Sequence, residues 1–497
     1  MTAGLQLENG TLYANSNRPL PQELLSEIFS HCIQTSDFSE KWPTSKSAPL
    51  TLTWVCRNWR NLVISQQRFW TTISLGEYGS NPANDAQLFD LWIQRAGNNR
   101  SLNIKLCHEM DDSKRPVFFE PERGEQYIVG MHSLMKKMTS VQDRWHTIDL
   151  HALDLYVLEP ILRALLSGAP RLKSLSISTK YFNFYGSVYF VDLSHCPSLQ
   201  NLRLLSPTLS PPAATTSNTA ANMKSLELRC CQQMQDCLTW LEICPNLESL
   251  DARLFRTTSV SLYREQGLLM MSRLTRLHIA SYTDDADPNL LLDLLDLPAL
   301  RDLSLDMNGL LNLELEESWS NKILRLIKRS KAPLEKLSLI GTPMTTHTLM
   351  QLMERTPYLK ELVLSGAIIS DELIESLHLR QNTKKNMSII HKMEDREFDL
   401  CPTLEFIEFR EFQCSLEPLI SMIHARCRTA VESHNSSILN CDGETSQNTG
   451  YLKKLNLIMS PHPTLLSHTL IRECTMGGLK IKNRSINLAT TPEPRPM

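Results

Sequence analysis

The sequence predicts an α/β protein in which a short N-terminal helical module precedes a curved solenoid with parallel inner strands and outer helices. Two observations predict this arrangement. A leucine-containing phrase recurs through most of the chain, with helical patterns between its copies. In addition, 497 residues exceed the size at which a single hydrophobic core stops growing, so several domains or an elongated repeat array is expected. We expect both.

Near the N-terminus, two helical segments and a strand are expected. Apolar residues recur at helical spacing in residues 18–33, behind a pair of prolines, and again in residues 50–64. Between them, residues 34–49 form a polar stretch with two prolines. A short third segment, 65–70, precedes the alternating residues 71–75, which predict a strand.

This helical module, about fifty residues long, is too small to bury its apolar faces well by itself. Part of that surface should therefore contact a partner. The alternative is that the helices are an ordinary cap on the next domain, and the apolar pattern alone does not decide between the two.

Three blocks of sequence favour the first interpretation: residues 20–29 (LPQELLSEIF), residues 55–62 (VCRNWRNL) and Phe69-Trp70. Together they resemble the F-box, in the form abundant in mushroom-forming fungi. The resemblance covers residues 18–75 and implies docking of the first helices onto a Skp-family adaptor. The long insert at 34–49 departs from a compact F-box. By this resemblance the adaptor-binding positions are Leu20, Pro21, Leu24, Leu25, Ile28, Val55 and Trp59.

The recurring phrase in the rest of the chain is Pro-x-Leu-x-x-Leu-x-Leu. Its first leucine, or the equivalent methionine, lies at positions 172, 199, 223, 247, 274 and 300, which are 24 to 27 residues apart. Later gaps are longer. Helical patterns separate the copies, so each unit is a helix, a turn and a strand that needs stacked neighbours to bury its leucines.

The interval and the phrase resemble the leucine-rich repeats that follow F-boxes. We expect the repeats to fill residues 76–481, between a flexible start at 1–17 and a flexible tail at 482–497. Stretches rich in polar residues or prolines predict loop insertions near residues 206–222, 380–396 and 432–450.

The charge balance argues against nucleic acid and membrane partners. The chain has 51 Lys and Arg residues against 54 Asp and Glu residues, which gives no strong overall field. No secretion signal or stretch of about 20 apolar residues is evident in the sequence. We therefore expect a cytoplasmic or nuclear protein with reduced cysteines and protein partners.

Catalytic, cofactor and metal motifs were sought and not found in the sequence. Cys196, Cys244 and Cys401 each precede the proline of a repeat, which predicts small buried residues at a turn. The densest cysteine group lies between Cys230 and Cys237 and contains no Cys-x-x-Cys pair. There is no Gly-rich phosphate loop, His-Glu-x-x-His helix or Gly-x-Ser-x-Gly elbow. We expect a non-catalytic chain without metal or cofactor.

The period of two in the repeat strands predicts which side chains face outward on the inner, concave surface. If Leu175 and Ile177 point inward, Ser174 and Ser176 point outward. The same registration predicts a basic region followed by an acidic one, with Glu227 and Asp251 diluting the basic part. This surface could bind a substrate of complementary charge or a phosphorylated motif; alternatively, its residues are simply solvated. The outward residues are Arg203, Arg229, Arg253, Arg276, Asp302, Asp306, Glu361 and Glu408.

The resemblance implies a substrate-recognition adaptor of a Skp-cullin-F-box ubiquitin ligase, in which the F-box binds the Skp-family adaptor and, through it, a cullin. The repeats would bind an unknown protein substrate. One alternative is an interaction scaffold without cullin, and another is an unrecognised thiol enzyme or zinc protein.

Overall fold

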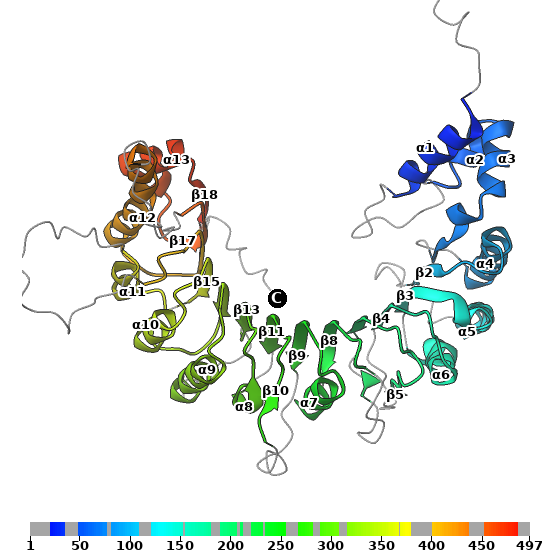
Figure 1. Cartoon of the computed structure of the whole chain (residues 1–497), viewed down its shortest axis with the longest axis horizontal. Helices are drawn as coiled ribbons and strands as arrows, with labels where there is room; N and C mark the ends of the chain where they lie inside the picture. The colour runs from blue at the N-terminus through cyan, green and yellow to red at the C-terminus, as the bar shows by residue number, and fades with distance from the viewer. Residues whose placement is uncertain are drawn as a thin grey trace, which may run out of the picture. The chain divides into compact units, whose positions relative to one another are not determined.

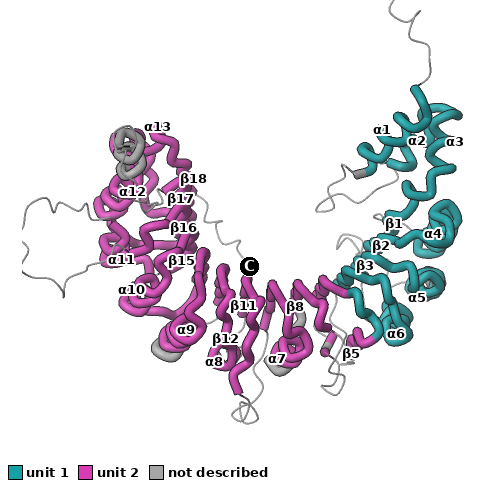
Figure 2. The backbone as a smooth tube through the Cα atoms, viewed as in Figure 1, with its two compact units in different colours: residues 1–183, 195–198 teal, residues 184–194, 199–497 magenta. Residues whose placement is uncertain are grey.

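In the computed structural model the chain forms two compact units (Figure 2). The first unit comprises residues 1–183 and 195–198, and the second comprises residues 184–194 and 199–497. The structure describes residues 20–34, 48–76, 81–108, 121–152, 155–179, 189–205, 209–211, 220–231, 234–254, 267–281, 289–307, 316–366, 368–378, 400–436 and 452–485.

The first unit begins with helices and continues as alternating strands and helices. Its elements are α1 (Gln22–Gln34), α2 (Leu52–Val55), α3 (Arg57–Ser65), η1 (Gln67–Trp70), β1 (Thr72–Leu75), α4 (Pro82–Ala96), β2 (Leu102–Cys107), α5 (Pro121–Thr139), η3 (Gln142–Arg144), β3 (Trp145–Ala152), η4 (Leu155–Leu158), α6 (Glu159–Ser167) and β4 (Ser174–Thr179).

The second unit repeats the strand and helix alternation. Its elements are β5 (Tyr189–Phe190), β6 (Asn201–Leu205), β7 (Leu209–Ser210), β8 (Ser225–Cys231), α7 (Met234–Ile243), β9 (Ser249–Leu254), β10 (Leu269–Met270), β11 (Arg276–Ser281), α8 (Asn289–Leu294), β12 (Leu295–Asp296), β13 (Asp302–Asp306), α9 (Glu316–Ser330), β14 (Lys336–Ile340), α10 (Thr346–Glu354), β15 (Glu361–Ser365), α11 (Asp371–Ser376), β16 (Phe406–Arg410), α12 (Leu416–Ser436), β17 (Lys454–Ser460), η7 (Leu465–Ser467), α13 (Thr469–Met476) and β18 (Lys480–Ser485).

The strands of the large sheet are parallel, and neighbours in the sheet follow the order of the chain. The first unit contributes the order β1-β2-β3-β4, and the second contributes β6-β8-β9-β11-β13-β14-β15-β16-β17-β18. In the second unit the described helices lie on one side of the sheet, and no described helix covers its other side (Figure 1). We call this uncovered side the open face. The predicted α/β class with parallel inner strands is therefore confirmed for the described residues, and the sheet does not close.

A ladder of aligned leucines forms the core behind the sheet. Leu226, Leu250, Leu277 and Leu303 lie at the same level of adjacent strands and are at most 1% exposed. The first leucine or methionine of each phrase is also buried, and in most phrases its N–H donates back across a turn, as Leu247 does to the carbonyl of Cys244 at 3.2 Å. The repeating phrase thus encodes a repeating turn followed by a repeating strand.

The turn explains three of the cysteines. Cys196, Cys244 and Cys401 are each at most 1% exposed, as their place before a repeat proline predicts. A small side chain fits this position because the turn packs directly against the leucine ladder.

Three boundaries differ from the sequence predictions. Residues 50–64 do not form one helix, because Cys56 is extended (φ −158°, ψ 170°) and separates α2 from α3. Strand β18 continues to Ser485, four residues beyond the predicted end of the repeats. Helix α12 extends to Ser436 and so includes the start of the predicted 432–450 loop. The predicted loop at 380–396 and the predicted flexible start at 1–17 lie outside the described residues.

Candidate functional site

Helix α1 has two opposite faces of different character. Ser26, Phe29 and Ser30 are at most 8% exposed and pack inward. Leu24 and Ile28, one turn apart, are 54% and 46% exposed, on the side of the helix opposite Ser26 and Ser30. Leu20, just before the helix, continues this row and is 53% exposed. The helix therefore presents a row of apolar side chains outward.

The inward face is held in place by aromatic and polar contacts. The ring of Phe29 lies edge-on to Trp59 of α3 at a centroid distance of 4.7 Å, and 6.4 Å from Phe69 of η1. The Arg68 guanidinium donates to the Ser26 hydroxyl at 2.6 Å and to the Ser26 carbonyl at 3.2 Å. These contacts fix the rotation of α1, so the outward direction of its apolar row follows from packing.

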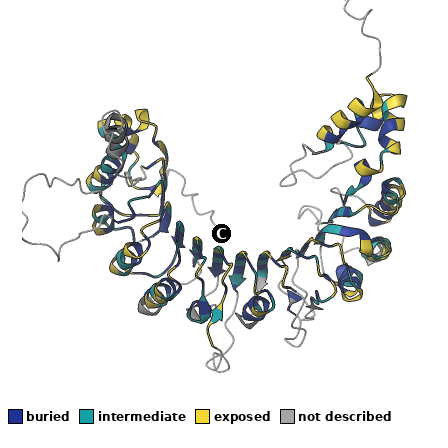
Figure 3. Cartoon of the chain, viewed as in Figure 1, coloured by how far each residue is buried: buried dark blue, intermediate teal, exposed yellow. Residues whose placement is uncertain are grey.

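Helix α2 adds two large exposed side chains. Trp54 is 64% exposed and Val55 is 60% exposed, whereas the preceding Leu52 is buried. A tryptophan held this far into solvent is unusual, because its ring carries a large apolar area. Figure 3 shows the exposed parts of α1, α2 and α3 in yellow. We call Leu20, Leu24, Ile28, Trp54 and Val55 the apolar row.

The predicted adaptor-binding residues fall into two groups in the structure. Leu20, Pro21, Leu24, Ile28 and Val55 are exposed. Leu25 and Trp59 are only partly exposed, and Trp59 packs against Phe29. The sequence prediction did not include Trp54 among the adaptor-binding residues, because a continuous helix through residues 50–64 would place Trp54 away from the predicted adaptor-binding positions.

The open face of the second unit displays the predicted outward residues. Strand β9 alternates between half-buried Ser249, Asp251 and Arg253 and buried Leu250 and Ala252. In most other strands, too, every second side chain is buried and the side chains between them are less buried and face the open side. The residues on the open face include Arg203, Arg229, Arg253, Arg276, Asp302, Asp306, Glu361 and Glu408.

The basic end of this face is largely paired with acidic side chains. Glu227 lies 2.6 Å from Arg203 and 2.7 Å from Arg229. Asp251 lies 3.1 Å from the His278 ring. Burial by itself raises the pKa of Asp251, but the hydrogen bond with His278 and the charges of Arg229, Arg253 and His278 outweigh it and lower that pKa.

The acidic end is paired as well. Lys336 lies 3.5 Å from Asp302 and 3.9 Å from Glu361. Glu408 lies 2.5 Å from Arg410 and accepts a hydrogen bond from the Asn456 amide at 2.8 Å. The expected separation into a basic and an acidic region is thus weaker than the sequence indicates, because ion pairs within and between strands compensate both ends.

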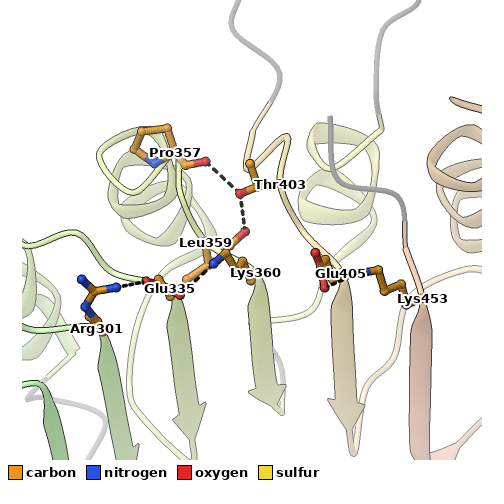
Figure 4. A network of polar contacts seen from close by, with 8 residues as sticks. All are labelled: Arg301, Glu335, Pro357, Leu359, Lys360, Thr403, Glu405 and Lys453. Atoms are coloured by element: carbon orange, nitrogen blue, oxygen red, sulfur yellow. Dashed lines mark hydrogen bonds and ion pairs between the residues drawn. The ribbon is translucent and has the colours of Figure 1, made fainter. Parts of the chain in front are cut away.

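A second set of polar contacts links the turns that lead into the strands (Figure 4). Glu335 bonds to Arg301 and, at 2.9 Å, to Lys360 on the other side. Lys360 lowers the pKa of Glu335 through this hydrogen bond. Burial opposes the shift, and the hydrogen bond and charge of Arg301 lower the pKa further. Further along, Lys453 bonds to Glu405 at 2.8 Å. These pairs align neighbouring repeats.

Within the described residues, no three His, Cys, Asp or Glu side chains are grouped as a metal site would require. The side chains of Cys230 and Cys231 lie outside this description. None of the helices in the described part of the chain is both long and apolar enough to cross a membrane.

Comparison of the sequence with models of protein families and with curated proteins finds no match.

Proposed function

We propose that the chain is a substrate-recognition adaptor of a Skp-cullin-F-box ubiquitin ligase, in which an N-terminal F-box binds a Skp-family adaptor. The observation that carries this proposal is the apolar row: five large side chains turned to solvent, four of them on α1 and α2 and Leu20 just before α1. Large exposed apolar groups in a small module are typical of an interface. Leu20, Leu24, Ile28 and Val55 lie in the blocks that resemble the F-box, and Trp54 lies one residue before the second block.

The size of the apolar row supports a specific contact. Full burial of a leucine or valine side chain stabilises by about 1.5–3 kcal/mol, so covering half-exposed ones contributes about 1 kcal/mol each. Trp54 adds a larger ring, and tryptophan is a frequent anchor of protein interfaces. The fixed rotation of α1 also limits the entropy that binding would remove.

The second part of the proposal assigns substrate binding to the leucine-rich repeats. Their open face presents charged and polar side chains along many parallel strands, which suits recognition of a protein surface or segment. Holding the substrate beside the ligase raises the effective concentration of its lysines near the ubiquitin-charged enzyme. The transfer chemistry belongs to other subunits, and the chain itself is non-catalytic.

The test is capture of a purified Skp-family adaptor by the full chain. Replacing Leu20, Leu24 and Ile28 with Ala should weaken capture at least about tenfold, which corresponds to about 1.4 kcal/mol. The matched control replaces the exposed leucines Leu91 and Leu166 of the same unit with Ala. Circular dichroism should show unchanged folding in both variants.

Two results would contradict the proposal. If the variant with Ala at positions 20, 24 and 28 captures the adaptor as well as the unaltered chain does, the N-terminal helices do not act as an F-box. Capture of the Skp-family adaptor without recruitment of a purified cullin would leave an interaction scaffold in place of a ligase subunit.

A further inference from the structure

Strands β17 and β18, at the end of the second unit, carry a group of cations on the open face. Lys454, Lys480, Lys482 and Arg484 are all exposed, and Ile481 and Asn483 between them turn toward the helices. Lys454 is paired in register with Lys480, so two ammonium groups occupy neighbouring positions. We call these four residues the terminal basic group.

Little negative charge compensates this group. On the open face of β16, β17 and β18 the only carboxylate is Glu408, which pairs with Arg410 at 2.5 Å and also interacts electrostatically with Lys454. Within the described part of the chain, Lys480, Lys482 and Arg484 form no salt bridge. Lys454 lies over the Phe406 ring at 4.7 Å, which orients its ammonium group. Like charges directly opposite each other destabilise a sheet, so an anion in contact with them would be favoured.

The backbone of β18 offers a second means of recognition. Among the described strands, β18 is the last in the sheet order and pairs only with β17. The Lys480 N–H donates to the Lys453 carbonyl at 3.0 Å, toward β17. In a parallel pair the N–H and C=O of one residue point to the same neighbour, and alternate residues point the other way. The N–H and C=O groups of Ile481 and Asn483 therefore face the outer edge.

We propose that an extended acidic segment of a protein partner binds this edge as an additional strand. Its backbone would bond to Ile481 and Asn483, about 4.8 Å from β18. Acidic residues at every second position would then lie beside Lys480, Lys482 and Arg484, whose spacing has the same period of two. The positive charge of the terminal basic group and the edge-facing N–H and C=O groups of β18 therefore both favour an extended acidic segment.

An alternative role for cations on an edge strand is to discourage edge-to-edge aggregation. That role would be sufficient to explain the two lysines of β18, Lys480 and Lys482. It does not explain Lys454, which lies one strand inward from the edge and adds to the same charge. The proposal depends on the proposed function only in calling the bound protein a substrate.

The experiment measures fluorescence anisotropy of the full chain with a labelled peptide of about nine residues, the length of a long strand. The peptide has glutamate at every second position and threonine between. Lys480→Glu with Lys482→Glu should weaken binding at least about tenfold, and salt should weaken binding to the unaltered chain. The control is Arg325→Glu with Lys328→Glu on α9, which changes the net charge equally on the helix side.

Further probes separate the possible ligands. A peptide of the same composition with contiguous glutamates should bind less well, and so should one with N-methylated threonines, because it cannot bond to the edge. Equal binding of either peptide would overturn strand addition. Preferential binding of single-stranded DNA or of anionic phosphatidylserine vesicles would overturn the protein partner.

Two more outcomes decide the proposal. If the peptide binds only after removal of residues 486–497, the chain's own C-terminus occupies the edge and the foreign partner is excluded. If the Lys480→Glu, Lys482→Glu variant unfolds, the Lys480→Gln, Lys482→Gln variant is measured in its place. Unchanged peptide binding by this second variant would show that the terminal basic group is not the binding site. No Skp-family adaptor is present in these measurements, so their failure is separate from a failure of adaptor capture.

Discussion

The ring of Phe29 meets Trp59 edge-on, with centroids 4.7 Å apart and planes inclined by 61°. This contact joins α1 to α3, and Phe29 is fully buried. Phe29→Ala should therefore lower the free energy of unfolding of the helical module by about 3–5 kcal/mol, as removal of a buried aromatic ring does. Hydrogen exchange of α1 and α3 amides should accelerate strongly.

Leu24→Ala, on the same helix, is the control for Phe29→Ala. The Leu24 side chain is 54% exposed, so Leu24→Ala should change the free energy of unfolding by less than about 1 kcal/mol. Equal acceleration of hydrogen exchange in the two variants would show that Phe29 does not hold α1 in place.

Arg426 of α12 is 1% exposed, and its guanidinium donates to three backbone carbonyls. It reaches Leu377 at 2.7 Å, Leu400 at 2.8 Å and Cys401 at 3.2 Å. Arg426→Met should destabilise the second unit by about 3–5 kcal/mol, because buried carbonyls lose their donors. Urea unfolding measures this, and exposed Arg472→Met on α13 should have little effect. A similar midpoint for both variants would contradict this role.

Asp251 should make the stability of the second unit dependent on pH. Its folded pKa lies below the value of about 3.9 expected in an unfolded chain. The charged form therefore stabilises the fold above about pH 4, and this contribution is lost as the pH falls through the folded pKa. Urea unfolding should show Asp251→Asn as less stable than the unaltered chain at neutral pH, with the difference shrinking in acid. A difference that stays constant with pH would exclude this linkage.

The thiols should differ in reactivity by position. Cys32 and Cys56 are exposed, whereas burial raises the pKa of Cys244 and of Cys401 to about 12. Arg426 opposes the shift at Cys401 only in part. Since the thiolate is the reactive form, iodoacetamide at pH 8 should modify Cys32 and Cys56 first. Mass spectrometry of the labelled peptides gives the order, and early labelling of Cys244 would contradict its burial.

Much of the repeat architecture could be predicted because it depends on local, repeated features. The first leucine of a phrase, such as Leu247, must be buried to close the turn, and the period of two then sets the strand faces. This is why the outward direction of Arg203 and Asp302 agrees with the structure. The compensation of the basic end was predicted in part, since Glu227 and Asp251 share the outward register. The pairing of Asp302 with Lys336 was not predicted, because it depends on which side chains of adjacent strands meet.

The remaining features depend on contacts between distant residues. The break at Cys56 leaves the apolar spacing of residues 50–64 intact, so periodicity alone does not reveal it. Arg426 is polar and sits on a helix, which predicts an exposed side chain, yet its partners are 25 to 49 residues away in the chain. The exposure of Trp54 follows only once the packing of α2 is known.

The chain-order pairing of the strands bears on how the second unit folds. From β8 to β18, each strand of its large sheet bonds only to the strands before and after it in that sheet, such as β14 with β13 and β15. Forming a pair therefore closes a loop of only a few dozen residues, which keeps the entropy of closure small. Folding can begin at any neighbouring pair and spread in both directions. A weakened repeat in the middle would then divide the unit into two segments that unfold separately.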